Sequence, residues 1–259
     1  MKTLMQHVNG IEEKKFVKLV MDYAKRADTQ NRPFFTHFYN KEWMQSLIKQ
    51  YVHQEAYLCY DFYGGYEEAE RQILAISPYA LDHSAFEIGI ISIQVKVGIG
   101  KALSHRDYLG ALLGMGLERH TIGDIILNAS GAYVFVEKNM IPYIKNELFS
   151  IGRYQKIQIE EITVDNICLE KPKTKVIETT VSALRMDAIC AVAFGMSRSA
   201  SAKLIEGDKA RCNGLIVDVS DRVKEGDTIT LRGFGKAKIT SVNGLTKKDR
   251  MHVTIEKYL

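Results

Sequence analysis

The stretch "LRMDAICAVAFGMSRSASAKLIEGDKARCNG", residues 184–214, decides the fold of the C-terminal part of the chain. A mostly apolar run comes first and predicts a helix. Ser197 then stands where a helix N-cap would accept backbone hydrogen bonds. Gly207 suits the C-terminal end of a second short helix. Beyond it, charged Lys209 and Arg211 alternate with small residues, which predicts a strand.

Cations gather on these elements. Arg198 begins the second helix, Lys203 lies toward its far end, and Arg185 stands in the first turn of the preceding helix. Guanidinium groups on rigid elements suit a phosphate backbone, because Arg binds phosphate oxygens bidentately. A solvated charged face that keeps the domain soluble is the alternative interpretation. The residues expected to bind RNA are Arg185, Ser197, Arg198, Lys203, Lys209, Arg211 and Asn213.

The charge of the whole chain is unevenly distributed. The 259 residues carry a net charge of +4. Residues 182–259 hold 14 Lys and Arg against 9 Asp and Glu, whereas residues 1–181 hold 21 against 22. A basic terminal module on a near-neutral body is typical of an attached polyanion-binding domain.

The C-terminal module resembles the S4 RNA-binding domain, a family named after a small-subunit ribosomal protein. The resemblance departs at Lys209 and Cys212, where the family usually has small or apolar residues. It implies RNA binding by this module. The matching residues are Arg185-Met186-Asp187, Ser197-Arg198, Ala202, Leu204-Ile205, Gly207, Asn213-Gly214 and Gly226-Asp227.

The sequence as a whole predicts an α+β protein made of three small domains. Residues 1–78 read as an N-terminal α+β domain, and residues 79–165 give elements in the order βαββαβ. That order predicts a central ferredoxin-like, RRM-like sandwich. Residues 166–180 are polar, rich in lysine and interrupted by Pro172, which predicts a linker. The S4 domain is expected over residues 181–259.

Details of the central domain carry further expectations. Ser104 and Asp107 form a variant of the capping box, which predicts a helix start. Tyr133 and Phe135 share one face of a strand, as stacking aromatics would in an RNA-recognition sheet. A buried core is the favoured interpretation of both rings. Glycines are expected to let the helix approach its sheet closely, and these are Gly110, Gly114 and Gly116.

Composition excludes several classes of protein. No run of about 18 apolar residues exists, so no membrane span is expected. Residues 1–16 lack the apolar core of a signal peptide. The protein is therefore expected in the cytoplasm, with reduced thiols and no zinc ribbon, because its cysteines form no CxxC. These cysteines are Cys59, Cys168, Cys190 and Cys212.

No recognisable catalytic motif stands out. The aspartate context of a pseudouridine synthase is missing, and "HTIGD" at 120–124 lacks the second histidine of a tyrosine-type synthetase. Gly98-x-Gly100 is the nearest candidate for a cofactor loop, but two glycines are a weak signal. We therefore expect no catalysis, cofactor, metal, membrane or small-molecule substrate.

Two further segments carry a resemblance over nearly the whole chain. "YGGYEEAER", 63–71, and "LSHRDYLGALLGMGLERHTIGDI", 103–125, resemble YlmH-type proteins, which are bacterial three-domain proteins ending in an S4 domain. The resemblance implies a non-enzymatic protein that binds rRNA and tRNA on a large ribosomal subunit carrying obstructed peptidyl-tRNA, in translation quality control. Arg106 and Arg119, which flank the central helix, are secondary RNA candidates. An RNA-modifying enzyme with an unrecognised catalytic domain and an interaction protein of the division machinery remain alternatives.

Overall fold

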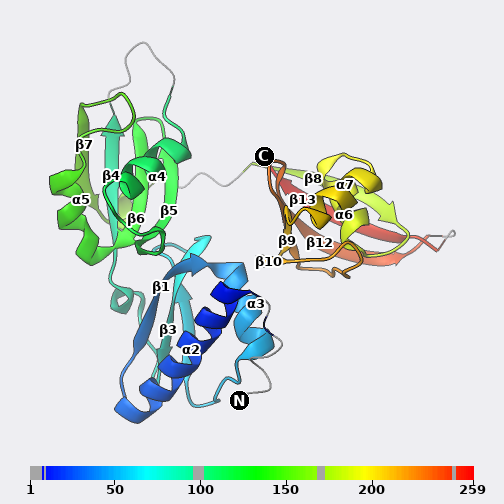
Figure 1. Cartoon of the computed structure of the whole chain (residues 1–259), viewed down its shortest axis with the longest axis horizontal. Coiled ribbons are helices and arrows are strands. Elements are labelled where there is room, and N and C mark those ends of the chain that lie inside the picture. Colours follow the sequence, from blue (N-terminus) through cyan, green and yellow to red (C-terminus); the bar gives the residue numbers. More distant parts are fainter. Residues whose placement is uncertain (1–7, 9, 96–101, 168–172, 247–248) are drawn as a thin grey trace. The chain divides into compact units, whose positions relative to one another are not determined.

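The computed structural model describes residues 8, 10–95, 102–167, 173–246 and 249–259 (Figure 1). The chain divides into two compact units, Met1–Cys168 and Leu169–Leu259. Each unit combines helices with antiparallel sheets, which confirms the α+β class. The expected boundary between residues 78 and 79 falls within the first unit and stays a prediction. The Gly98-x-Gly100 pair lies outside the described residues.

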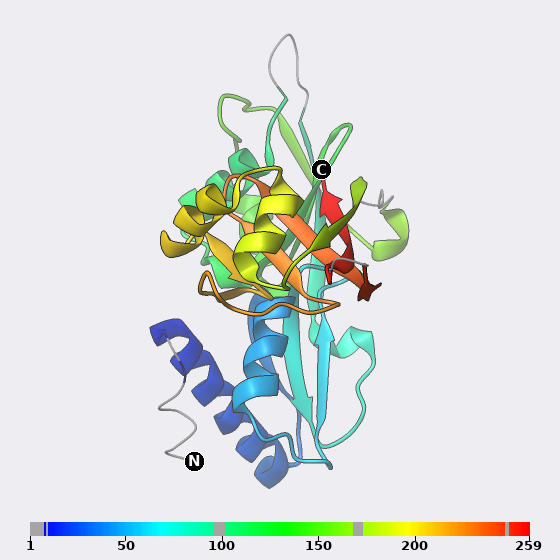
Figure 2. The same cartoon turned by 90° about the vertical axis from the view of Figure 1, so that its right-hand side faces the viewer.

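The first unit begins with a three-stranded sheet in the order β1-β3-β2. Both long helices lie on one side of this sheet (Figure 2). They bury apolar side chains such as Val17 of α2 and Leu47 of α3. Asn40 starts the second of them, because its side chain accepts a hydrogen bond from the Trp43 amide. The elements are α2 (Ile11–Gln30), β1 (Phe34–Asn40), α3 (Lys41–Tyr51), β2 (Cys59–Tyr63) and β3 (Arg71–Ser77).

A second sheet of the same unit has the strand order β5-β6-β4-β7. Its helices and strands follow the order βαββαβ, and every neighbouring pair of strands is antiparallel. This is the arrangement of a split βαβ sandwich. The elements are η1 (His83–Phe86), β4 (Ile88–Val95), α4 (His105–Gly114), η2 (Arg119–Thr121), β5 (Ile122–Asn128), β6 (Gly131–Glu137), η3 (Lys138–Met140), α5 (Ile141–Glu147), β7 (Ile157–Ile162) and η4 (Val164–Asn166).

The helix α4 starts as expected but packs differently. Ser104 and Asp107 form the capping box, so that prediction is confirmed. A Cβ added at Gly110, Gly114 or Gly116 would meet no atom within 4 Å, so these glycines do not bring the helix close to its sheet. That expectation is wrong, because the sheet-facing positions of the helix are occupied by larger side chains such as Leu112.

The second unit places two short helices against one six-stranded sheet, in the order β10-β9-β11-β12-β13-β8 (Figure 1). In its core, Ile189 and Cys190 of the first helix pack with sheet residues such as Ile239 and Val253. The elements are β8 (Thr174–Val181), α6 (Met186–Phe194), α7 (Arg198–Glu206), β9 (Ala210–Cys212), β10 (Leu215–Ile216), β11 (Thr228–Leu231), β12 (Gly235–Leu245) and β13 (Met251–Tyr258).

The sequence predicts a linker over residues 166–180, but most of the second half of this segment forms the strand β8. Residues 174–181 pair with β13 along its whole length. The run "VIETTV" is rich in β-branched residues, which favour a strand, and this preference prevails over the lysines around it. Ile177 packs against the core and Val181 is buried in it. The C-terminal unit therefore includes this strand.

No single described helix is long and apolar enough to cross a membrane. The helices α6 and α7 reach that length and hydropathy only when taken together, and they are bent by 114° at their junction.

Candidate nucleic-acid interface

A buried carboxylate organises the cations of the opening stretch. Asp187 lies in the first turn of α6, and its side chain is only 8% exposed. Its Oδ1 accepts a hydrogen bond from Arg185 Nε at 3.1 Å, and its Oδ2 accepts one from Arg198 Nη2 at 2.6 Å. Two guanidinium groups are therefore fixed side by side at the start of the two helices, with 40% and 52% of their side chains exposed.

The two arginines stabilise the negative charge of the Asp187 carboxylate. Burial alone would raise the pKa of Asp187, but the hydrogen bonds from Arg198 and Arg185 outweigh burial and lower it below its usual value of 3.8. The carboxylate therefore stays ionised at neutral pH. Each arginine donates some of its N–H groups to Asp187. The side chains are partly exposed, so their other N–H groups can donate to a phosphate oxygen.

Two serines fix the helix that carries Arg198. Ser197 is its N-cap, and the Ser197 hydroxyl accepts a hydrogen bond from the Ala200 amide at 3.1 Å. Buried Ser201 donates to the backbone oxygen of Asp187 at 2.7 Å, which ties α7 to α6. The structure thus gives Ser197 a capping role, and its contact with RNA stays a prediction.

Three further cations lie exposed on the same unit. Lys203 is in the last turn of α7, Lys209 precedes β9, and Arg211 lies within β9. Within the described part of the chain, none of the three forms an ion pair with a carboxylate. Ala210, between the last two, is buried, so the alternation expected of this strand is present. These cations are available to an external anion.

The side chain of Asn213 connects the turn in which it lies to the start of β11. Asn213 adopts the left-handed conformation with φ of 49°, which Asn tolerates better than most residues. Its Oδ1 accepts from the Thr228 amide at 2.9 Å, and its Nδ2 donates to Asp227 Oδ1 at 2.9 Å. The segments Asn213-Gly214 and Gly226-Asp227, which match the S4 pattern in the sequence, are therefore bonded to each other. Direct recognition of RNA by Asn213 stays a prediction.

The two secondary candidates in the first unit differ from one another. Arg106 is exposed in the first turn of α4. Arg119 is half-buried, and its Nη1 donates to the backbone oxygen of Ile122 at 2.6 Å. Burial lowers the pKa of Arg119. Since this guanidinium holds the start of β5, the structure gives Arg119 a role in the fold, and only Arg106 faces solvent freely.

The two segments that carry the YlmH resemblance meet at Asp124. The Tyr66 hydroxyl donates to Asp124 Oδ2 at 2.8 Å, and the amides of Glu70 and Arg71 donate to the same carboxylate at 2.7 and 3.1 Å. Segment 63–71 is thereby bonded to the start of the second sheet. These bonds join the two sheets of the first unit.

The open face of the second sheet is partly covered at the same place. Phe135 is fully buried beneath the ring of Tyr66, with ring centroids 5.0 Å apart. The backbone of Gly65 approaches it so closely that an added Cβ would lie 2.4 Å from the ring. The core interpretation therefore holds for Phe135, while Tyr133 is only half-buried.

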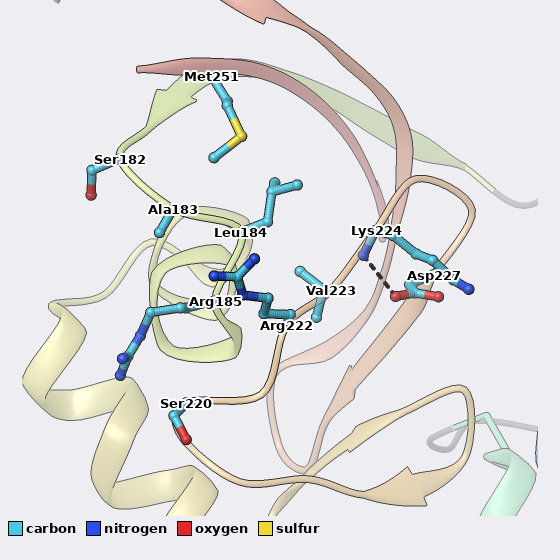
Figure 3. Close-up of a pocket in the computed structure, with 10 residues that line it drawn as sticks. All are labelled: Ser182, Ala183, Leu184, Arg185, Ser220, Arg222, Val223, Lys224, Asp227 and Met251. Atoms are coloured by element: carbon cyan, nitrogen blue, oxygen red, sulfur yellow. Dashed lines mark hydrogen bonds between the residues drawn. The ribbon is translucent and has the colours of Figure 1, made fainter. Parts of the chain in front are cut away.

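The second unit also contains an open groove of about 860 Å³. It lies between the start of α6 and segment 220–224, and its lining includes Arg185, Arg222 and Lys224 (Figure 3). Sequence reasoning did not single out Arg222. The available signal was the pair of cations in "DRVKEG", but nothing in the sequence places this segment beside α6.

The described residues offer no evident metal site. Among them, no three His, Cys, Asp or Glu side chains group as ligands would. Cys59, Cys190 and Cys212 are free thiols, and Cys168 lies outside the described residues. Burial raises the pKa of Cys190 to about 12, so this thiol is not a ready ligand or nucleophile at neutral pH.

Known proteins match both the central segment and the chain as a whole. A family model described as "Putative RNA-binding domain in YlmH" matches residues 82–166. The Bacillus subtilis (strain 168) protein named "Ribosome-associated protein quality control protein P2" is 29% identical over 260 residues, which cover 99% of each chain. The solved structure named "Cell division protein ylmH from Streptococcus pneumoniae" matches with a TM-score of 0.50 and 22% identity. That match covers 62% of this chain and 98% of the other.

The residues matched by the family model, 82–166, include all four strands of the split βαβ sandwich. The chain is similar to YlmH-type proteins: residues 82–166 match the model of their RNA-binding domain, and the whole chain matches the Bacillus subtilis relative. The Streptococcus structure, at 22% identity, adds support for the fold alone.

Proposed function

We propose that this is a cytoplasmic, non-enzymatic RNA-binding protein that associates with the large ribosomal subunit in translation quality control. It would contact ribosomal RNA and the tRNA of an obstructed peptidyl-tRNA. The family model for an RNA-binding domain and the name of the Bacillus subtilis relative support this proposal. In it, Leu169–Leu259 acts as an S4 RNA-binding domain.

The observation that carries the proposal is the pair of guanidinium groups fixed on Asp187. Arg185 and Arg198 are half-exposed and held in place by a buried carboxylate. Ordered guanidinium groups lose less conformational entropy when they bind a phosphate. The exposed cations of α7 and β9 lie on the same unit and can neutralise further phosphates along one strand.

Crosslinking in cells, followed by sequencing of the bound RNA, tests this function. We expect the crosslinked positions to accumulate on ribosomal RNA of the large subunit. Signal scattered over messenger RNA, or no signal above background, would contradict the proposal. The same experiment with Lys203 and Arg211 both changed to Ala serves as the matched control, because both side chains are exposed, and we expect its signal to be weaker.

The absence of catalysis is tested separately. The nucleosides of ribosomal RNA from cells with and without the gene can be compared by mass spectrometry. We expect identical modification profiles. A modification that disappears with the gene would favour the alternative, an RNA-modifying enzyme with a catalytic domain that the sequence does not reveal.

A further inference from the structure

The groove beside the Asp187 cluster has the size and lining of a binding site. Its volume of about 860 Å³ falls within the range of about 300–1,000 Å³ that is usual for small-ligand pockets. Leu184, buried Val223 and Met251 give it an apolar surface, and the exposed hydroxyls of Ser182 and Ser220 lie at its edge. An apolar surface with a few polar groups suits a planar ring with a polar edge.

The backbone fixes this groove next to the arginine pair. Arg185 and Arg222 stand opposite each other in an isolated antiparallel β-bridge. The Val223 amide donates to the backbone oxygen of Leu184 at 3.0 Å, which holds the two segments together. Like charges directly opposite each other are unfavourable. In Figure 3 the two side chains diverge, Arg185 toward α7 and Arg222 across the groove toward Ala183 and Leu184.

The lining of the groove has a net positive charge, with three cations, Arg185, Arg222 and Lys224, and one carboxylate, Asp227. Arg222 and Lys224 are exposed, and neither forms an ion pair with any residue that the structure describes. The carboxylate of Asp227, which also lines the groove, is buried and accepts hydrogen bonds from Asn213 Nδ2 and from the Lys224 amide. An anionic ligand is therefore the one that complements this surface.

We propose that the groove receives one unpaired nucleotide of the RNA strand whose phosphates are held by Arg185 and Arg198. This inference rests on the proposed function and extends it to base contact. A strand that crosses the arginine pair places its next nucleotide over the groove. The base lies against Leu184 and Met251, and the Arg222 guanidinium stacks on it or pairs with its phosphate.

Binding of two RNAs by the full chain tests this inference. One is a mixed-sequence single-stranded RNA, and the other has the same ribose-phosphate backbone with every base removed. We expect the wild type to bind the intact strand about tenfold more tightly than the abasic one, since base stacking contributes on that scale. Arg222→Ala should lose most of this preference, while Lys175→Ala, an exposed cation on β8, should keep it.

Occupancy of the groove can be observed directly through Met251. With its methyl group labelled for NMR, and assigned with Met251→Leu, we expect a shift on adding the intact strand and none on adding the abasic strand. Thermal melting of Arg222→Ala should match the wild type, because only an exposed side chain is changed. A base preference that survives in Arg222→Ala, or a Met251 methyl that does not respond, would overturn this inference alone. Failure of the wild type to bind either RNA would overturn the proposed function with it.

Discussion

Arg198 Nη2 lies 2.6 Å from Asp187 Oδ2, so the first residue of α7 is bonded to a buried carboxylate of α6. The other oxygen of that carboxylate accepts from Arg185. Arg198, one of the two arginines that we propose to bind RNA phosphates, therefore also stabilises the packing of two helices. A change at Arg198 affects folding as well as binding, contrary to what a surface arginine in the sequence would suggest.

Replacing Arg198 by Ala should destabilise the second unit by about 1–2 kcal/mol, because a buried carboxylate loses one of its two charged donors. This cost is smaller than that of breaking a fully buried ion pair, because the Arg198 side chain is 52% exposed. Urea unfolding measures the difference. Lys203→Ala on the same helix is the matched control and should stay within about 0.5 kcal/mol of the wild type. Equal stability of both variants would contradict the structural role.

The same carboxylate predicts how the second unit responds to acid. The folded-state pKa of Asp187 lies below the usual 3.8, so its ionised form favours the folded state above that pH. This contribution is lost as the pH falls from about 3.8 through the folded-state pKa. Asp187→Asn should remove that pH dependence and lower the stability at pH 7. We would follow unfolding free energy against pH for both proteins, and parallel curves would contradict the assignment.

Two glycines of the first unit should respond oppositely to the same substitution. Gly65 has a φ of +97°, and an added Cβ would lie 2.4 Å from Phe135, so Gly65→Ala should cost at least about 2 kcal/mol. Gly110 lies inside α4 with nothing within 4 Å, so Gly110→Ala should stabilise by about 0.5–1 kcal/mol. Thermal melting distinguishes them. Destabilisation by Gly110→Ala would instead restore the expectation that this helix needs its glycines.

The boundary of the C-terminal unit can be tested by truncation. A fragment that starts at residue 169 keeps β8, whereas one that starts at 182 exposes the edge of β13 and removes buried Val181. We expect the longer fragment to unfold cooperatively and the shorter one to aggregate or melt broadly. Circular dichroism melts would show this. Equal cooperativity of the two fragments would mean that β8 is dispensable.

The local signals in the sequence predicted much of this fold. The N-caps at Ser104 and Ser197 and the βαββαβ order follow from neighbouring residues, and each is present in the structure. The strand β8 was missed because its lysines and the preceding proline outweighed its β-branched run. Pairing with β13, which is far away in the sequence, decides its state, and no local pattern contains that partner.

The candidate site was predicted less completely for the same reason. The sequence identified Arg185 and Arg198 as cations but could not show that both donate to Asp187. It counted Asn213 as an RNA contact, although that side chain is bonded to Asp227 and to the Thr228 amide at the start of β11. Arg222 comes beside Arg185 only through a β-bridge between distant segments. Side-chain roles that depend on tertiary pairing are not visible in composition or spacing.

The central claim is that the exposed cations of the second unit hold RNA phosphates, and the salt dependence of binding tests it most directly. We would measure the affinity of the full chain for purified large ribosomal subunits at several salt concentrations, for the wild type and for Lys203→Ala with Arg211→Ala. Both side chains are exposed and free of ion pairs in the described structure, so thermal melting should be unchanged. We expect weaker binding and a slope of log affinity against log salt that is shallower by about 0.7 for each phosphate that the variant no longer neutralises. Unchanged affinity and slope in a folded double variant would contradict the claim and place the RNA surface elsewhere on the chain.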